Sequence, residues 1–266
     1  METAALDLKK FYKKRVRNIL QILDKDPCHF SDETVHQLRV EIKKIKATFH
    51  MVVALNKKFD AAYYLKPFRA LFKAAGKLRT IEIDRQLIAT YDLDGEGHEY
   101  MKTLSDSKER ARNKFHETIR SERRDKAIKL QKQKVVDVLS GISAKDIQKQ
   151  LSDDSKSLRR LFSKKIFRED ELHIVRKNLK RFYLVSKKTL PAQTAGELNT
   201  FLELLGKWHD RKETFLHLMK FAFSPEVEGP ERQRLNEIKS KILSDKESLF
   251  DQVVSRGLLD FKGTYS

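Results

Sequence analysis

The feature that most constrains this chain is a basic segment that occurs twice. The first copy, residues 35–50, reads VHQLRVEIKKIKATFH, and the second begins about 137 residues later with LHIVRKNLKRFY, at residue 172. Histidine, arginine and lysine stand in the same order in both, as His36, Arg39 and Lys43 in the first copy. An α-helix turns about 100° per residue, so these positions share one face. The repeat therefore predicts two helices that each carry a basic stripe headed by histidine.

The second copy carries the same charges at the same spacing. Its residues that match the first copy are His173, Arg176, Lys180 and Arg181. Of these, Arg181 corresponds to Lys44 of the first copy. Lys46 and His50 extend the first stripe, whereas Tyr183 stands at the position that corresponds to Lys46. We therefore expect two similar but unequal basic faces.

A buried stripe is also predicted for the first motif helix. Its apolar residues at helical spacing are Leu38, Ile42, Ile45 and Phe49. The centre of this stripe lies about 100° around the helix from the basic one. Long lysine and arginine stems can lie along apolar surface while their charged heads stay in water. The basic residues are thus expected to border the core and to reach into a groove between helices.

A second repeated element follows each motif helix. Residues 76–79 read GKLR in the first half, and residues 206–209 read GKWH in the second. A glycine in each copy would let two helices approach closely. The basic residues of this element are Lys77, Arg79, Lys207 and His209.

Composition predicts an all-α chain. The sequence has 39% hydrophobic and 35% charged residues, which suits amphipathic helices, and only nine glycines and five prolines. The pattern predicts two copies of a four-helix unit, residues 1–125 and 143–266, joined by a helical linker at 126–142. In the first unit, the third helix is expected to be interrupted near Lys66–Pro67.

The charge points to an anionic partner. The chain has 56 Lys and Arg against 38 Asp and Glu, a net charge of +18. A generally basic, soluble surface is the alternative. The single cysteine, Cys28, excludes an intrachain disulfide framework, and no apolar run is long enough for a membrane span. We expect a cytoplasmic protein without a membrane partner.

The doubled H-x-x-R-x-x-x-K-[KR] helix, followed in each half by an L-G-K-x-[RH] helix, resembles the CHAD domain, the conserved histidine α-helical domain. The resemblance covers about residues 4 to 256. It implies two four-helix bundles of long antiparallel helices, related by a pseudo-twofold axis. It also implies a basic groove between the bundles, lined by the motif residues, that binds inorganic polyphosphate.

The resemblance assigns the motif positions of both halves to polyphosphate binding. With Lys44 and Lys46 from the basic stripe, the candidate binding residues are His36, Arg39, Lys43, Lys44, Lys46, Lys77, Arg79, His173, Arg176, Lys180, Arg181, Lys207 and His209. Arginine can form forked bonds to phosphate oxygens, and lysine supplies a mobile point charge. A bound phosphate would also favour the protonated form of a motif histidine.

Two positions depart from the family pattern. The family usually follows its second element with aspartate, which is present as Asp210 but replaced by Thr80 in the first half. If that aspartate orients a motif arginine, Asp84 is the candidate substitute in the first half. Tyr183 is the other departure, because an arginine is expected there from the family pattern. The groove is therefore expected to be asymmetric.

Enzyme interpretations find little support in the sequence. No carboxylates cluster on the basic face, and the P-loop, G-x-S-x-G and H-E-x-x-H motifs are missing. We expect no catalytic residues, no metal site and no cofactor. Nucleic-acid or other polyanion binding stays open as the rival function, although no zinc-finger spacing or RNP-like aromatic run is present. The sequence thus predicts a non-catalytic polyphosphate-binding protein; granule association stays open and the oligomeric state is not predicted.

Overall fold

The structure is a computed structural model, and it describes residues 7–26, 30–91, 99–162 and 168–260. These residues form nine α-helices and no strand, which confirms the all-α prediction. The helices are α1 (Leu8–Leu23), α2 (Asp32–Leu55), α3 (Ala61–Tyr91), α4 (Glu99–Ile119), α5 (Glu122–Ser140), α6 (Ala144–Phe162), α7 (Glu169–Ser186), α8 (Ala192–Ala222) and α9 (Gly229–Asp260). No described helix has the length and apolar content of a membrane-spanning segment. Cys28 lies outside the described residues.

The two motif helices, α2 and α7, begin in similar ways. The Ser31 hydroxyl accepts a hydrogen bond from the Thr34 amide at 3.2 Å, and the Glu171 carboxylate accepts one from the Arg168 amide at 3.0 Å. Both contacts satisfy a backbone N–H group of the first turn that has no partner within the helix. Asp32 and Glu169 add negative charge to the first turns, where it interacts favourably with the helix dipole.

The predicted buried stripe of α2 is confirmed, since Leu38, Ile42, Ile45 and Phe49 are all fully buried. The predicted interruption at Pro67 is wrong, because α3 continues through this residue. Pro67 lies within the first two turns of α3. The one backbone bond that it removes is therefore close to the helix start, and the remaining turns propagate without it.

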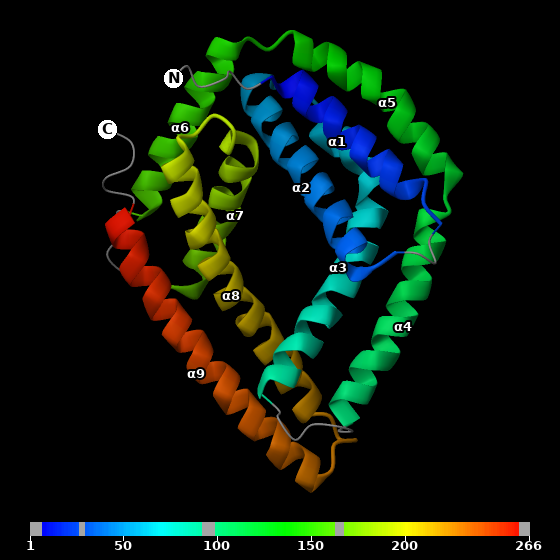
Figure 1. Cartoon of the computed structure of the whole chain (residues 1–266), viewed down its shortest axis with the longest axis vertical. Coiled ribbons are helices and arrows are strands. Elements are labelled where there is room, and N and C mark those ends of the chain that lie inside the picture. The colour runs from blue at the N-terminus through cyan, green and yellow to red at the C-terminus, as the bar shows by residue number, and fades with distance from the viewer. Residues whose placement is uncertain (1–6, 27–29, 92–98, 163–167, 261–266) are drawn as a thin grey trace.

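Buried side chains form two cores. The first collects residues of α1–α5 and also Leu218 of α8 and Leu235 of α9. The second lies between α6, α7, α8 and α9 and includes the fully buried Trp208. The long helices α8 and α9 therefore contribute to both cores, and they run beside each other along one edge of the molecule (Figure 1).

The segment expected as a linker lies mostly in α5. This helix passes α1 between the ends of α4 and α6 (Figure 1). Its residues Ile128, Val135 and Leu139 are buried in the first core. Helix α5 is thus packed along the first half rather than suspended between the halves.

Equivalent positions of the two halves meet where α3 contacts α8. Asp84 and Thr214 are separated by the same 130 residues as the two glycines of the second repeated element. The Thr214 hydroxyl donates to Asp84 Oδ1 at 2.6 Å, and both residues are buried. Contact between equivalent positions is the geometry that a twofold axis produces. The arrangement is consistent with the expected pseudo-twofold relation.

Candidate anion-binding site

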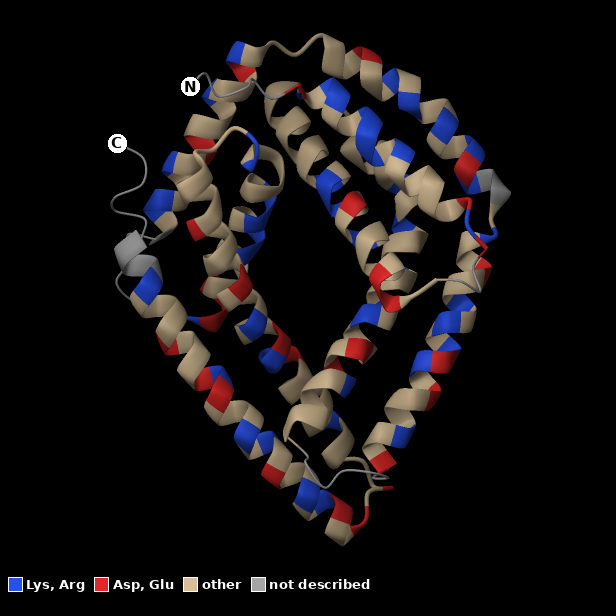
Figure 2. Cartoon of the chain, in the orientation of Figure 1, with Lys and Arg blue, Asp and Glu red and all other residues tan. Residues whose placement is uncertain are grey.

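Helix α2 contributes three basic residues to a site shared with α7, which it contacts. Burial, together with repulsion from Lys180, Arg39 and Arg176, lowers the pKa of Lys43 to about 7. Burial likewise lowers the pKa of His36, with Arg79, Lys43 and Lys180 adding to the effect. These side chains are near enough to act on one another across the two halves. Figure 2 shows basic positions on both α2 and α7, on either side of the centre of the molecule.

Helix α7 contributes Arg176 and Lys180. Burial lowers the pKa of Lys180, and Arg176 and Arg39 add to this effect. Lys43 and Lys180 are equivalent positions of the two halves. Repulsion from Lys180 is the largest effect on Lys43 after burial. The packing of the two halves therefore brings like charges together at the centre of the site.

Arg39 is held in place by α3. Its Nη1 donates to the Phe72 carbonyl oxygen at 3.0 Å, and its guanidinium lies 4.6 Å from the centre of the Phe72 ring. The Lys46 ammonium also lies over this ring, with Nζ 4.5 Å from the ring centre. The guanidinium passes directly over Gly76, where an added Cβ would lie 2.5 Å from Nη1. Gly76 thus makes room for a functional side chain.

Arg79 of α3 and Asp210 of α8 complete the shared part of the site. Burial raises the pKa of Asp210, although four cations act in the opposite direction. Those cations come from both halves: Arg176, Arg79, Lys180 and Lys43. Asp210 therefore interacts with cations of both halves. This explains how the first half can have Thr80 at the position that corresponds to Asp210. We call the set His36, Arg39, Lys43, Arg79, Arg176, Lys180, His173 and His209 the basic cluster.

The two histidines of the second half lie side by side. The ring centres of His173 and His209 are 5.3 Å apart. Burial lowers the pKa of His209 to about 3, and Arg176 is the next largest cause. His209 Nδ1 is buried without a hydrogen-bond partner. Burial also lowers the pKa of His173, so the neutral form of both rings is favoured at pH 7.

Other candidate residues lie away from the cluster. Lys44 Nζ is 2.8 Å from Glu41 Oε1, on the side of α2 that faces α1. Lys77 and Lys207 are exposed on α3 and α8, and Lys77 acts on His217 rather than on the motif helices. Lys46 and Arg181 lie beyond the cluster. Burial is the main cause of the lowered pKa of Lys46, followed by repulsion from Arg39, and Arg181 makes a smaller contribution.

Two expectations about supporting residues are wrong. Asp84 does not pair with a motif arginine, because its carboxylate binds Thr214 and is 2.9 Å from Nδ1 of His217. Gly206 has no heavy atom within 4 Å of an added Cβ, so it does not mediate a close helix approach.

Residues that the motif match missed are also present. Lys177 lowers the pKa of both Lys46 and His173, although burial is the main cause in each case. Its counterpart in the first half is Val40, so the repeat carries no signal for it. Phe72 lies outside the basic motifs, yet its ring contacts both Arg39 and Lys46. Among the described residues, no group of three or more His, Cys, Asp and Glu could hold a metal ion.

Comparison with known proteins identifies the class of protein. The sequence matches the CHAD domain family over residues 16–214, and the chain therefore belongs to this family. Its fold is similar to the crystal structure of the CHAD domain from the plant Ricinus communis, with a TM-score of 0.71 and 15% identity over 97% of this chain and 93% of that one. It is also similar to PptA from Streptomyces chartreusis, with a TM-score of 0.69 and 15% identity over 94% of this chain and 97% of that one. No curated protein matches the sequence.

Proposed function

We propose that this protein binds inorganic polyphosphate, without catalysis, on the basic cluster between α2 and α7. The observation that carries the proposal is the mutual repulsion of cations from both halves around the Asp210 carboxylate. Like charges at such a site lower one another's pKa and oppose folding unless an anion joins them. Membership of the CHAD family supports the same ligand.

Polyphosphate suits this arrangement chemically. It is a flexible chain with about one negative charge per phosphate, so it needs several cations along a path rather than one deep pocket. Arg39 and Arg176 can bind phosphate oxygens with two N–H groups each, and Lys43 and Lys180 can follow a moving chain as point charges. Bound phosphate would raise the pKa of Lys43 and of the histidines, so binding would take up protons.

The site lacks the groups that phosphoryl transfer generally requires. Such reactions use carboxylate-bound divalent metal or an activated nucleophile. Asp210 and Glu213 are the carboxylates that act on Arg176, and burial raises the pKa of Asp210. We therefore expect no sustained phosphate release from polyphosphate with Mg²⁺, as measured by a phosphate-release assay. Turnover that scales with protein concentration would contradict the non-catalytic assignment.

A charge-matched pair of variants tests the binding site. The first replaces four cluster cations and one motif histidine, as Arg39→Gln, Lys43→Gln, Arg176→Gln, Lys180→Gln and His36→Gln. The control replaces four exposed lysines of α4 and α5 with glutamine: Lys102, Lys114, Lys129 and Lys134. Calorimetric titration should show loss of long-chain polyphosphate binding in the cluster variant only, with helicity by circular dichroism unchanged.

The same pair separates this function from general polyanion binding. If the control loses as much affinity as the cluster variant, net charge alone explains binding and the site assignment fails. Competition at fixed salt provides a second criterion. Duplex DNA or RNA that displaces polyphosphate at equal phosphate concentration would favour a nucleic-acid or general polyanion binder. Fluorescent tagging would test the proposed cytoplasmic location and association with polyphosphate granules.

A further inference from the structure

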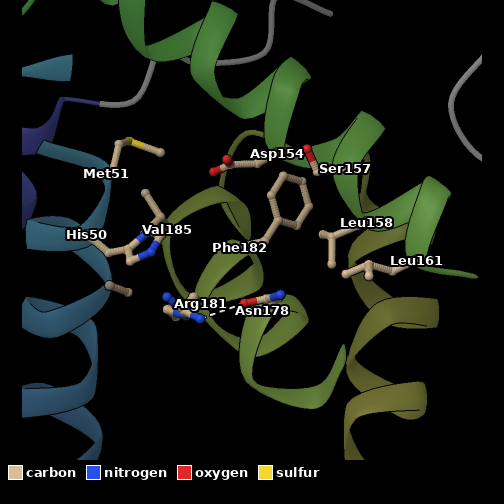
Figure 3. Close-up of a pocket in the computed structure, with 11 residues that line it drawn as sticks. His50, Met51, Asp154, Ser157, Leu158, Leu161, Asn178, Arg181, Phe182 and Val185 are labelled. Atoms are coloured by element: carbon tan, nitrogen blue, oxygen red, sulfur yellow. Dashed lines mark hydrogen bonds between the residues drawn. The ribbon is translucent and has the colours of Figure 1, made fainter. Parts of the chain in front are cut away.

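A pocket opens between α2, α6 and α7, beyond the basic cluster along both motif helices (Figure 3). Its volume is about 190 Å³. Pockets for drug-sized ligands measure roughly 300–1,000 Å³, so this one has space for a single ring system. His50 reaches it from α2, Ser157 and Leu158 from α6, and Arg181 and Phe182 from α7 (Figure 3).

One side of the pocket is apolar. Phe182 is buried in the second core and its ring lies between α6 and α7 at the pocket (Figure 3). Leu158 and Met51 lie on either side of it. A flat heterocycle can stack on an aromatic ring or on an arginine guanidinium. Phe182 and Arg181 are adjacent on α7 and provide both surfaces.

The other side carries a cation that the fold leaves without a carboxylate. In the first half, Lys44 forms an ion pair with Glu41, which also accepts from Arg15 at 3.1 Å. In the second half, the equivalent pair is Arg181 with Asn178, and Arg181 Nη2 donates to the neutral Asn178 oxygen at 2.5 Å. Within the described residues Arg181 has no ion pair. The same position is therefore neutralised in one half and positive in the other.

The charged residues of the pocket are connected to the basic cluster through Lys46. Burial lowers the pKa of His50, and Arg181 is the next cause, while Asp154 acts in the opposite direction. His50, Arg181 and Asp154 thus face one another across the pocket. Lys46 lies between Arg181 and the cluster, because Arg39 and Arg181 both act on it. An anionic chain that leaves the pocket at Arg181 would meet Lys46 and then Lys43.

We propose that this pocket holds the base of a nucleoside polyphosphate whose phosphate chain extends from Arg181 onto the basic cluster. The apolar face of Phe182 receives the ring, and the Asp154 carboxylate, which accepts from Gln150 at 2.8 Å, has capacity for an amino group on its edge. The phosphate half of this inference rests on the proposed function, whereas the base half rests on the pocket alone.

Calorimetric titration with ATP and with inorganic tripolyphosphate, at equal ionic strength, tests the inference. Both carry three phosphates, so a preference for ATP measures what the nucleoside adds. Stacking of one base is expected to make ATP bind on the order of tenfold more tightly. Ser157→Trp fills the pocket from an exposed position of α6 and should remove this preference while leaving tripolyphosphate binding intact.

Ser152→Trp provides the matched control, since Ser152 is exposed on the same helix but does not line the pocket. It should bind ATP as the unaltered protein does. Equal affinities for ATP and tripolyphosphate in the unaltered protein would overturn the inference, as would a preference that survives Ser157→Trp. If neither tripolyphosphate nor long-chain polyphosphate binds, the proposed function fails instead, and ATP binding would then rest on the pocket alone.

Discussion

The contact between α7, α8 and α9 differs sharply from the contact between α7 and α2. At the first, Glu169 lies 2.9 Å from Lys212 and 2.7 Å from Lys246, so one carboxylate joins three helices. At the second, Lys43 and Lys180 face each other, and neither forms an ion pair with any described residue. The same fold thus satisfies its lysines in one place and leaves them opposed in another.

This difference indicates that the basic cluster is not a consequence of a generally basic surface. Structural cations are paired even at the start of α2, where Asp32 accepts from Lys108 of α4 at 2.9 Å. Removing charges from water without a partner costs free energy, and repulsion adds to that cost. At the interface of the two halves this cost is carried by partly buried cations, and an external anion would offset it.

The largest expected effect is the pH dependence of stability and affinity that arises at the contact between α2 and α7, where Lys43 has no ion pair. The pKa of Lys43 falls to about 7 in the folded protein, from 10.5 in an unfolded chain. Between these values the unfolded state binds more protons, so the free protein gains stability as pH rises. Bound polyphosphate returns the proton to Lys43, so affinity should fall on the order of tenfold per pH unit above pH 7.5.

Titration calorimetry in buffers of different ionisation enthalpy would measure the proton uptake directly. Lys43→Met should reduce it by about one proton and flatten the pH dependence of both affinity and stability. Lys134→Met, at an exposed position of α5, is the control. Proton uptake that is unchanged in Lys43→Met would contradict the assignment of this lysine to the cluster.

The next effect separates the two glycines of the second repeated element. Gly76→Ala places a methyl group against the Arg39 guanidinium and should displace it from the Phe72 carbonyl. Loss of a charge-assisted contact predicts about tenfold weaker polyphosphate binding. Gly206→Ala has open space, so it should leave binding unchanged and stabilise α8 by about 0.5–1 kcal/mol. Equal affinities in the two variants would refute this role of Gly76.

A smaller effect is expected from moving the carboxylate. Thr80→Asp restores the family residue in the first half and gives the cluster a second internal anion. It should weaken polyphosphate binding by roughly threefold to tenfold at low salt, because the new charge competes with phosphate. Asp210→Asn should have the opposite effect, since Asp210 acts on four cations. Affinities that move in the same direction in both variants would disprove the competition.

The smallest effect concerns the contact between α7, α8 and α9. Glu169→Gln removes the partner of Lys212 and Lys246. These groups are partly exposed, so the free energy of unfolding should fall by only about 1 kcal/mol, measured by urea denaturation. Polyphosphate affinity should be unchanged, because Glu169 lies outside the basic cluster. A large change in affinity would mean that the two regions are energetically connected.

Much of the helix pattern and the candidate site could be predicted from the sequence. The apolar spacing of Leu38, Ile42 and Phe49 identified the buried face of α2, and the repeat identified the residues that share the basic face. Local signals are sufficient here because helical geometry places side chains by their spacing alone. The prediction failed at Pro67, where the position of the proline within α3 mattered more than its presence.

The order of residue types was sufficient to predict a helical chain, two related basic stripes, and the differences between the halves at Thr80 and Tyr183. Which charged side chains lie close together depends on how the helices pack, and helical spacing alone does not predict it. Packing brings Lys43 near Lys180 and places Asp210 near cations of both halves. It also brings Asp84 into contact with Thr214 and His217, whereas Lys44 forms an ion pair with Glu41. The physical reason is that periodicity fixes the direction of a side chain around its own helix. Its partner belongs to a different helix, and the packing of the two halves brings that helix into reach.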